Sequence, residues 1–385
     1  TSSSPEMTFS NYNYDSAYEY YYGNLTDNET YFFTDSTEVC PSSYLHGADI
    51  YLPILYSIIF LTGFIGNLFV ITVVAAKGKR NGRLVDIFVV NLALADLVFV
   101  FTLPLWAVSA SQSGRWNFGL IGNALCKLSS YAIAVNRFSN IFFLTCMSVD
   151  RYLAVVKLMD SRFLRSSQCI RVTCAVVWLV SLVLGIPSLV YRSVEDNGNG
   201  PICLENTQSL FFLGLSLTSV ILTFVLPVLI IILCYGTIIT HLQKHCAAAG
   251  NSRADARRRH SLKMVLFIIV AFIVSWLPFN IFKTIIISSQ LSDAELSCYS
   301  LSWQRDGLII SCCLAFLNSC VNPAIYFFFD HHFRRHAKNL YLSCLAKPLL
   351  LQSHNSSGSF TNIGTSESSW TTVFRGRLQS FDQKG

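Results

Sequence analysis

The sequence predicts an all-α membrane protein, a seven-transmembrane helix bundle with a short amphipathic eighth helix. Of the 385 residues, 52% are hydrophobic and only 13% are charged. Apolar runs of about 18 residues or more recur with short polar gaps, and a run of that length spans a bilayer as a helix. Lysine and arginine are absent from residues 1–50 and gather in particular gaps between the runs. This asymmetry indicates a membrane topology rather than nucleic-acid binding.

Residues 1–49 are expected to form an extracellular, disordered tail, because they are polar and acidic and lack helical or strand periodicity. The sequons at Asn24 and Asn28 become N-glycosylation sites if this end lies outside the cell. A run of tyrosines and acids also has the composition that invites sulfation: Tyr12, Tyr14, Asp15, Tyr18, Glu19, Tyr20, Tyr21 and Tyr22. A sulfated tail would attract a basic protein ligand from a distance. A solubilising tail with no ligand role is the alternative.

Residues 50–329 are expected to form the membrane domain, with seven spans whose ends are uncertain by about 2–4 residues. The spans lie near residues 50–77, 84–110, 122–156, 168–192, 209–245, 259–290 and 303–329. Basic residues follow the first and third spans and precede the sixth: Lys77, Lys79, Arg80, Arg83, Lys157, Arg162, Arg165, Arg253, Arg257, Arg258, Arg259 and Lys263. The positive-inside rule therefore places the N-terminus outside the cell and the C-terminus in the cytoplasm.

Two segments follow the last span. Residues 330–346 alternate basic and apolar faces and predict an amphipathic helix on the membrane surface. Cys344 in this segment is a candidate for palmitoylation, and a plain free thiol is the alternative. Residues 347–385 are rich in serine and threonine and are expected to be a disordered cytoplasmic tail.

Polar residues interrupt the spans where hydrophobicity alone would not place them. Asp96 is ionisable and lies deep in the second span, so it needs a partner. Six residues can supply amide or hydroxyl oxygens facing it: Asn67, Asn136, Asn140, Asn318, Ser319 and Asn322. One negative charge among neutral oxygens suits a hard monovalent cation better than zinc or calcium. A hydrogen-bonded core without any ion is the alternative.

The third span ends in Asp150, Arg151 and Tyr152. A charge at mid-bilayer costs about 2.5–3.5 kcal/mol, so the acid and the guanidinium are expected at a membrane boundary, where they can meet a cytosolic partner. Pro278 and Pro323 each remove a helix hydrogen bond and predict kinks in the sixth and seventh spans. A kinked helix can pivot, and Trp276 lies next to the first of these kinks.

The order of these residues over residues 50–335 resembles the rhodopsin-like G-protein-coupled receptors at every span. The set includes Asn67, Asp96, Asp150-Arg151-Tyr152, Trp178, Pro227, Tyr235, Trp276, Pro278, Asn318, Asn322, Pro323 and Tyr326. The resemblance implies that the sixth helix swings outward beside Arg151, that Tyr235 and Tyr326 hold the opening, and that sodium at Asp96 favours the resting state. Core packing is the alternative role of Trp276.

The resemblance also implies two disulfides. Cys126–Cys203 would join the third helix to the second extracellular loop, and Cys40–Cys298 would tie the N-terminal tail to the loop before the seventh helix. The second bridge is typical of chemokine, apelin and angiotensin-type receptors. The segments 102–106 and 116–119 resemble that branch, and the segments 149–158 and 185–192 are similar to orphan receptors within it.

Four residues are candidates for ligand binding: Trp106, Arg192, Lys283 and Arg305. Cations near a pocket mouth suit a ligand carboxylate, such as a peptide C-terminus. Headgroup contacts by the long side chains of Lys283 and Arg305 are the alternative. Chemokine receptors often carry glutamate eleven residues before the seventh-helix proline, where this chain has Cys312. That departure disfavours the ordinary capture of a chemokine N-terminus.

The resulting expectation is a plasma-membrane receptor that transmits binding of a secreted peptide or chemokine-like protein to a heterotrimeric G protein, through the inhibitory Gi/o class. Arrestin would bind the phosphorylated tail at Ser353, Ser356, Ser357, Ser359, Thr361, Thr365, Ser366, Ser368 and Ser369. The sequence carries no nucleophile–base pair or phosphate loop, which disfavours an enzyme. It also lacks the repeated halves of a transporter and the seventh-span lysine of a retinal protein. A scavenger receptor that does not signal through G proteins is the alternative, and the intact residues 150–152 favour coupling.

Overall fold

A computed structural model of the chain describes residues 47–76, 83–157, 166–196, 200–205, 209–246, 253–292 and 297–342, without the side chains of residues 245, 246 and 253–261. Several predictions concern residues outside these ranges: both glycosylation sites, the tyrosine-rich segment, Cys40, Cys344 and the phosphorylated tail. The chain divides into the units Thr1–Ala337 and Lys338–Gly385, and the bundle described below belongs to the first.

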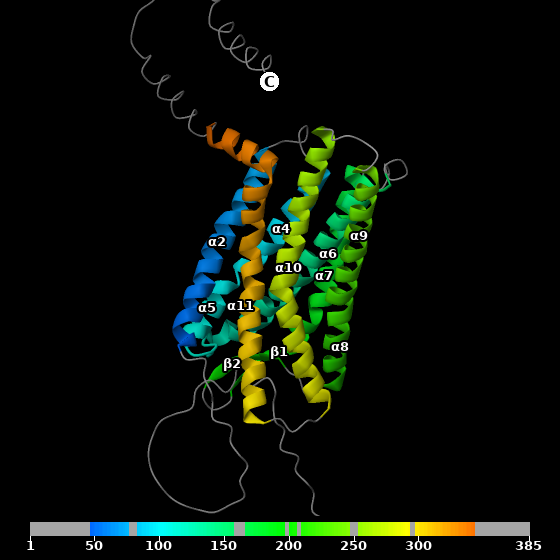
Figure 1. Ribbon diagram of the computed structural model, residues 1–385. Coiled ribbons are helices and arrows are strands. Elements are labelled where there is room, and N and C mark those ends of the chain that lie inside the picture. The colour runs from blue at the N-terminus through cyan, green and yellow to red at the C-terminus, as the bar shows by residue number, and fades with distance from the viewer. Residues whose placement is uncertain are drawn as a thin grey trace, which may run out of the picture. The chain divides into compact units, whose positions relative to one another are not determined.

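Seven helical spans are long and apolar enough to cross a membrane within the part of the chain that the structure describes, which confirms the predicted fold class (Figure 1). They are built from α2 (Ala48–Ala76), α4 (Leu84–Val100) with α5 (Leu103–Ser111), η1 (Gly119–Ile121) with α6 (Gly122–Val155), α7 (Ser167–Val190), α8 (Leu210–Val220) with η2 (Ile221–Val225) and α9 (Leu226–Cys246), α10 (Arg253–Leu291), and α11 (Cys298–Phe329).

Two spans are interrupted, and proline accounts for both positions. The second span breaks between α4 and α5, where Pro104 near the start of α5 has no backbone N–H to continue the ladder. The fifth span widens into the π-helical turn η2 immediately before Pro227 in α9. Pro278 and Pro323, by contrast, lie inside the continuous helices α10 and α11.

The helix ends agree with the predicted spans at most positions and differ at two. The helix α11 begins at Cys298 instead of near residue 303, because Ser297 caps it by accepting a hydrogen bond from the amide of Ser300 at 3.3 Å. The helix α10 begins at Arg253 instead of near residue 259, so the helix continues into a polar segment that hydropathy does not mark as membrane-spanning.

A two-stranded antiparallel hairpin follows α7. The strands are β1 (Arg192–Asp196) and β2 (Pro201–Glu205), and their register places Arg192 opposite Glu205. Arg192 was predicted to end the fourth span, but α7 stops at Val190 and the arginine backbone pairs with β2 instead. We call the end of the bundle that carries this hairpin the hairpin end, and the end that carries Asp150 and Arg151 the Arg151 end.

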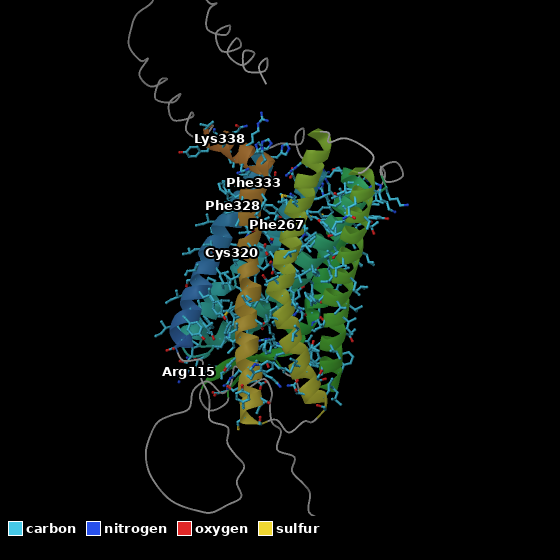
Figure 2. All side chains as sticks on the ribbon, viewed as in Figure 1. Arg115, Phe267, Cys320, Phe328, Phe333 and Lys338 are labelled. Carbon is cyan, nitrogen blue, oxygen red and sulfur yellow. A yellow bond between two sulfur atoms is a disulfide. The ribbon has the colours of Figure 1, made fainter. Side chains whose placement is uncertain are left out.

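The bundle exposes large apolar side chains, as expected for a protein surrounded by lipid, and encloses a group of polar side chains within a largely apolar core. Leu233 and Phe328 are 70% and 67% exposed, whereas Asn67 and Asp96 are fully buried. Figure 2 shows Phe328 among the outward-facing side chains. Hydrocarbon surrounds such a surface in a membrane and offers no hydrogen bonds. The buried polar groups must therefore form hydrogen bonds with one another.

Residues 331–342 are helical and follow Asp330, which confirms the predicted eighth helix within the range 330–346. Phe333 is buried, with its ring centroid 5.7 Å from that of Phe69 and 6.3 Å from that of Tyr326. The first turn of this helix is therefore part of the core of the bundle, and its contact with a membrane surface stays a prediction.

Candidate functional site

The polar core is centred on the carboxylate of Asp96 in α4. Its Oδ1 accepts hydrogen bonds from Nδ2 of Asn136 and Nδ2 of Asn140, both at 2.9 Å, and its Oδ2 accepts from Nδ2 of Asn322 at 3.0 Å. Asn136 and Asn140 lie one turn apart on α6, and Asn322 lies on α11. One carboxylate thus joins three helices at the centre of the bundle.

The remaining predicted members of this core make different contacts. Asn67 donates from Nδ2 to the backbone carbonyls of Gly63 at 2.8 Å and Ser319 at 2.9 Å, so it joins α2 to α11. Ser319 contributes its backbone oxygen to this contact, and Asn318 is buried on the same helix. The structure therefore brings Asn136, Asn140 and Asn322 onto Asp96 and ties Asn67 to Ser319.

Oxygen acceptors remain open beside the Asp96 carboxylate. The side-chain oxygens of Asn140 and Asn322 are buried and have no hydrogen-bond partner among the described residues, and the same is true of Asn67 and Asn318. Buried acceptors are rarely left without a partner. Carboxylate and amide oxygens are the ligands of hard cations, so this donor set fits a sodium ion.

The Trp276 side chain fills the space next to the proline of α10. It is 3% exposed, with ring centroids 6.0 Å from Phe272 and 5.7 Å from Phe279. Pro278 has no N–H to donate within the helix, and the side chain of Asn280 donates to the carbonyl of Trp276 at 2.8 Å. Asn280 was not predicted, since an asparagine within an apolar run shows its partner only after folding.

At the Arg151 end, Arg151 lies beside the acid of its own motif. Its Nη2 is 3.5 Å from Oδ2 of Asp150, and both side chains are largely buried. Tyr152 packs beside a buried cluster of Val155, Ile238 and Leu262, which joins α6, α9 and α10. The Arg151 guanidinium is thus largely enclosed in this conformation, next to a cluster that holds α6, α9 and α10 together.

The two predicted tyrosines of the switch are also buried. The hydroxyls of Tyr235 on α9 and Tyr326 on α11 have no hydrogen-bond partner among the described residues. A buried hydroxyl without a partner carries an unmet desolvation cost. Both hydroxyls would therefore be stabilised by a conformation in which they form a hydrogen bond.

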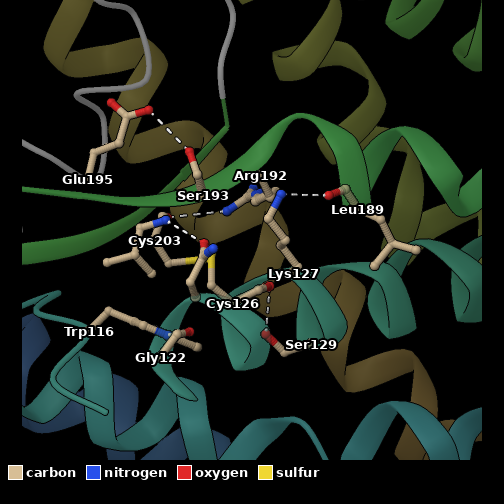
Figure 3. The surroundings of a disulfide bond; sticks show 12 residues. Trp116, Gly122, Cys126, Lys127, Ser129, Leu189, Arg192, Ser193, Glu195 and Cys203 are labelled. Atoms are coloured by element: carbon tan, nitrogen blue, oxygen red, sulfur yellow. Dashed lines mark hydrogen bonds between the residues drawn. A yellow bond between two sulfur atoms is a disulfide. The ribbon is translucent and has the colours of Figure 1, made fainter. Parts of the chain in front are cut away.

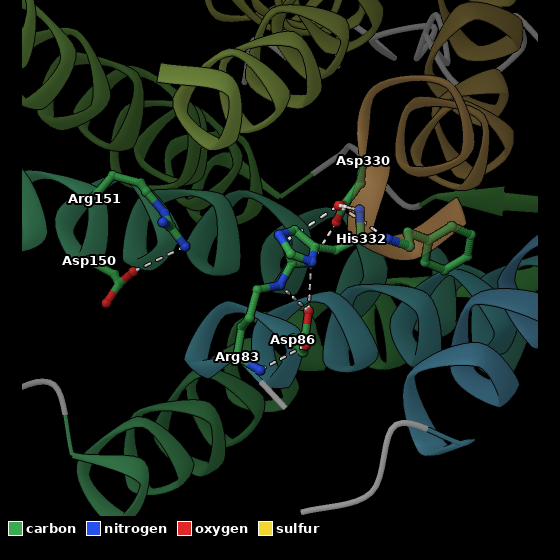
Figure 4. A network of polar contacts seen from close by, with 7 residues as sticks. Arg83, Asp86, Asp150, Arg151, Asp330 and His332 are labelled. Carbon is green, nitrogen blue, oxygen red and sulfur yellow. Dashed lines mark hydrogen bonds and ion pairs between the residues drawn. The ribbon is translucent and has the colours of Figure 1, made fainter. Parts of the chain in front are cut away.

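A second charge network at the same end was not predicted (Figure 4). Arg83 Nη2 lies 3.0 Å from Oδ1 of Asp86 and 2.5 Å from Oδ2 of Asp330. Asp330 Oδ1 in turn accepts from the backbone amides of His332 at 2.9 Å and Phe333 at 3.2 Å. Burial lowers the pKa of Arg83, but the two carboxylates outweigh it and raise that pKa above its ordinary value. The network links the start of α4 to the first turn of the helix at 331–342.

At the hairpin end, a disulfide joins Cys126 at the start of α6 to Cys203 in β2, with the Cα atoms 5.7 Å apart (Figure 3). This confirms the first predicted bridge. Cys298 is also disulfide-bonded, and Cys40, its predicted partner, lies outside the described residues. Nη1 of Arg192 donates to the carbonyl of Cys203 at 3.4 Å, which fixes this arginine over the bridge.

Glu205, two residues after the bridge, lies within a group of cations. Its Oε2 is 2.6 Å from Nζ of Lys283 on α10, and it also interacts electrostatically with Arg192 and Arg137. Burial raises the pKa of Glu205, but Lys283 and Arg192 outweigh burial and lower that pKa to about 2. The acid is therefore ionised at physiological pH.

Arg137 on α6 completes this group, which we call the outer cluster: Glu205, Lys283, Arg192 and Arg137. The Arg137 guanidinium lies 4.7 Å from the ring centroid of Phe138 and 5.4 Å from that of Phe279. Cys312 on α11 lies near the same three cations. The outer cluster thus occupies the place where chemokine receptors would have a glutamate, but its acid comes from the hairpin.

Two further ligand-binding candidates lie elsewhere. Trp106 packs against Trp116, with ring centroids 5.0 Å apart, beside the Cys126–Cys203 bridge. Nε of Arg305 lies 3.6 Å from Oδ1 of Asp306, its neighbour on α11. Lys283 and Arg192 therefore share one acid, whereas Arg305 has another acid beside it.

A family model described as 7 transmembrane receptor (rhodopsin family) matches residues 66–326. G-protein coupled receptor 15 of Mus musculus is 38% identical over 303 residues, 79% of this chain and 82% of that protein. Probable G-protein coupled receptor 25 of Mus musculus is 38% identical over 307 residues, again 79% and 82%. Apelin receptor A of Danio rerio is 40% identical over 295 residues, 74% and 80%. The resemblance inferred from the motifs is thereby confirmed.

Proposed function

The chain belongs to the rhodopsin family of seven-transmembrane receptors, and on that premise we propose that it couples a secreted peptide ligand to a heterotrimeric G protein. It is a multi-pass membrane receptor and not an enzyme. Within the proposal, the hairpin end faces the outside of the cell at the plasma membrane and the Arg151 end faces the cytoplasm. The distribution of basic residues supports that orientation.

The observation that carries the ligand class is the outer cluster. Three cations there face one internal acid, so the site favours an additional carboxylate such as a peptide C-terminus. Relatives named for the peptides apelin and angiotensin II support the same class of ligand. A chemokine-like protein is the second form of this ligand, and the acidic tail at 1–49 would attract its basic surface.

The chain's own residues supply a route between the two ends. A ligand group that contacts Lys283 acts on α10 beyond Pro278, where the helix lacks one hydrogen bond and bends easily. Trp276 transmits this movement to the core. Separation of α6, α9 and α10 at the Arg151 end then frees the Arg151 guanidinium to donate to the C-terminal helix of a G-protein α subunit. The hydroxyls of Tyr235 and Tyr326 gain partners in that opening.

Sodium is proposed as an allosteric ion of the resting state. Asp96, Asn140 and Asn322 would hold it, and its charge would compensate the buried carboxylate. The same carboxylate then keeps α4, α6 and α11 together. When the receptor opens, α11 rearranges at Asn322 and Pro323, and the hydrogen bond between Asn322 and Asp96 weakens.

Coupling to the Gi/o class and recruitment of arrestin complete the proposal. The chemokine-like resemblance of the sequence supports Gi/o, and the serine-rich segment 347–385 supports arrestin binding after phosphorylation. A scavenger receptor that binds ligand without G-protein turnover is the competing function. The intact Asp150, Arg151 and Tyr152 favour coupling over scavenging.

The test is a screen of secreted peptides, each with a free and an amidated C-terminus, on cells that express the chain. Gi activation is the readout, and the Arg151→Ala variant is the control that keeps the outer cluster. We expect peptides with a free carboxylate to activate the chain and the control to remain silent. Ligand uptake by wild type and control alike, without activation of any heterotrimer, would establish the scavenger function instead.

A further inference from the structure

The charges of the outer cluster do not balance. Lys283, Arg192 and Arg137 carry three positive charges, and Glu205 interacts with all three. These four residues together therefore keep a surplus of two positive charges in a partly buried place, where uncompensated charge is costly. In addition, Nε of Arg137 is buried and has no hydrogen-bond partner within the described ranges. This site can therefore hold more negative charge than Glu205 alone provides.

The Glu205–Lys283 pair also connects two parts that move relative to each other in the proposed function. Glu205 lies two residues from Cys203, whose disulfide fixes the hairpin to α6. Lys283 lies five residues beyond Pro278 on α10. An ion pair of 2.6 Å between them holds the outer part of α10 against a hairpin that α6 keeps in place.

We propose that Glu205 is a built-in occupant of a carboxylate site made by Lys283, Arg192 and Arg137, and that a carboxylate of the peptide ligand replaces it on Lys283. This inference rests on the proposed function. The exchange leaves neither acid unpaired, because Glu205 remains directly opposite Arg192 in the hairpin. The entering carboxylate meets Lys283 together with the Arg137 guanidinium, which two aromatic faces hold in place.

The replacement releases α10 from the hairpin. The resting chain therefore restrains its own sixth span by an internal contact that imitates the ligand. An acid fixed on α11 at position 312 would remain with the cations after ligand binding, whereas an acid on a hairpin can withdraw from Lys283. Cys312, which lies near the same cations, leaves the role of the acid to Glu205.

The first test compares Glu205→Gln with Glu195→Gln in purified receptor in lipid nanodiscs. Glu195 is an exposed acid on the same hairpin that accepts from Ser193, so its substitution is a matched control. Hydrogen exchange is expected to rise in residues 192–205 and 278–291 of Glu205→Gln, together with ligand-free nucleotide exchange on the G protein, on the order of tenfold. The control is expected to match wild type. Wild-type hydrogen exchange in Glu205→Gln would overturn the proposal. So would wild-type basal signalling in Glu205→Gln, when the same receptor responds to an activating peptide.

The second test uses acetate as the carboxylate probe and chloride at equal sodium concentration as its reference. Acetate is expected to increase hydrogen exchange of the hairpin several-fold in wild type and in Glu195→Gln, because it displaces Glu205. Lys283→Gln and Arg137→Gln are expected to show the same exchange in both salts. A response of these two variants equal to that of wild type would overturn the carboxylate site.

Failure of the receptor to signal and failure of the carboxylate site give different experimental results. If no variant and no wild-type preparation promotes nucleotide exchange on any heterotrimer, the proposed function is wrong. The carboxylate site is then decided by hydrogen exchange in the acetate experiment, which involves no G protein.

Discussion

Substitution of Asp330 separates two contributions that meet in one carboxylate at the Arg151 end. Its Oδ1 accepts the amides of His332 and Phe333 and so caps the helix at 331–342, while Oδ2 pairs with Arg83. Asparagine caps a helix about as well as aspartate but carries no charge. Asp330→Asn therefore removes the ion pair and keeps the cap, whereas Asp330→Ala removes both.

The magnitudes follow from exposure and geometry. The Arg83 side chain is 31% exposed and that of Asp330 only 6%, so we place the pair near the upper end of the range for exposed pairs, at about 1 kcal/mol. Loss of an N-cap costs about 1 kcal/mol more. Asp330→Asn should thus destabilise the first turn by about 1 kcal/mol and Asp330→Ala by about 2 kcal/mol.

Hydrogen exchange at the amides of His332 and Phe333 measures this directly, because both amides donate to Asp330. Since about 1.4 kcal/mol is tenfold in an equilibrium, protection should fall roughly fivefold in Asp330→Asn and roughly thirtyfold in Asp330→Ala. Arg83→Gln is expected to reproduce the asparagine variant, and combining the two should add little. Equal protection in the asparagine and alanine variants, or additive effects of Arg83→Gln and Asp330→Asn, would refute this division of roles.

Three further predictions test the core, the outer cluster and the tail. Asp96→Asn turns the acceptor that faces Nδ2 of Asn322 into a donor, so the substitution should lower the free energy of unfolding by about 1–3 kcal/mol. It should also abolish any extra stabilisation by sodium over potassium, measured as unfolding midpoints in sodium chloride and potassium chloride. A sodium response that survives in Asp96→Asn would count against the ion site. The pKa of Glu205 is lowered from 4.5 to about 2, so its contribution to stability should be complete above about pH 4.5 and lost as the pH falls toward 2. The difference in the free energy of unfolding between wild type and Glu205→Gln should therefore shrink as the pH falls from 4.5 to 2. A difference that stays constant over this range would contradict the ion pair. Removal of the residues after Lys347 should reduce arrestin recruitment and spare G-protein coupling in cell assays; equal recruitment by the truncated chain would reject the tail as the arrestin site.

The sequence alone determined the features that depend on local composition. Hydrophobic length defined the seven spans, because any helix that crosses hydrocarbon needs such a run wherever its neighbours lie. Charged residues are rare inside a membrane, and this rarity identified Asp96 and predicted that nearby amides bind it. Three of the predicted partners donate hydrogen bonds to Asp96: Asn136, Asn140 and Asn322. The resemblance supplied the pairing of Cys126 with Cys203.

Which charges meet depends on how the helices and the hairpin pack in three dimensions. Glu205 and Lys283 are 78 residues apart in the chain, and Arg83 and Asp330 are 247 apart. The sequence does not show that Glu205 or Asp330 has a partner. A glutamate at the end of a loop strand, or an aspartate after an apolar run, can equally well be exposed to solvent. The disulfide fixes the hairpin that carries Glu205 to α6, and the packing of α6 beside α10 places Lys283 within reach. The packing of α4 against α11 brings Arg83 to Asp330. Ion pairs follow the distances that folding creates, and hydropathy contains no information about those distances.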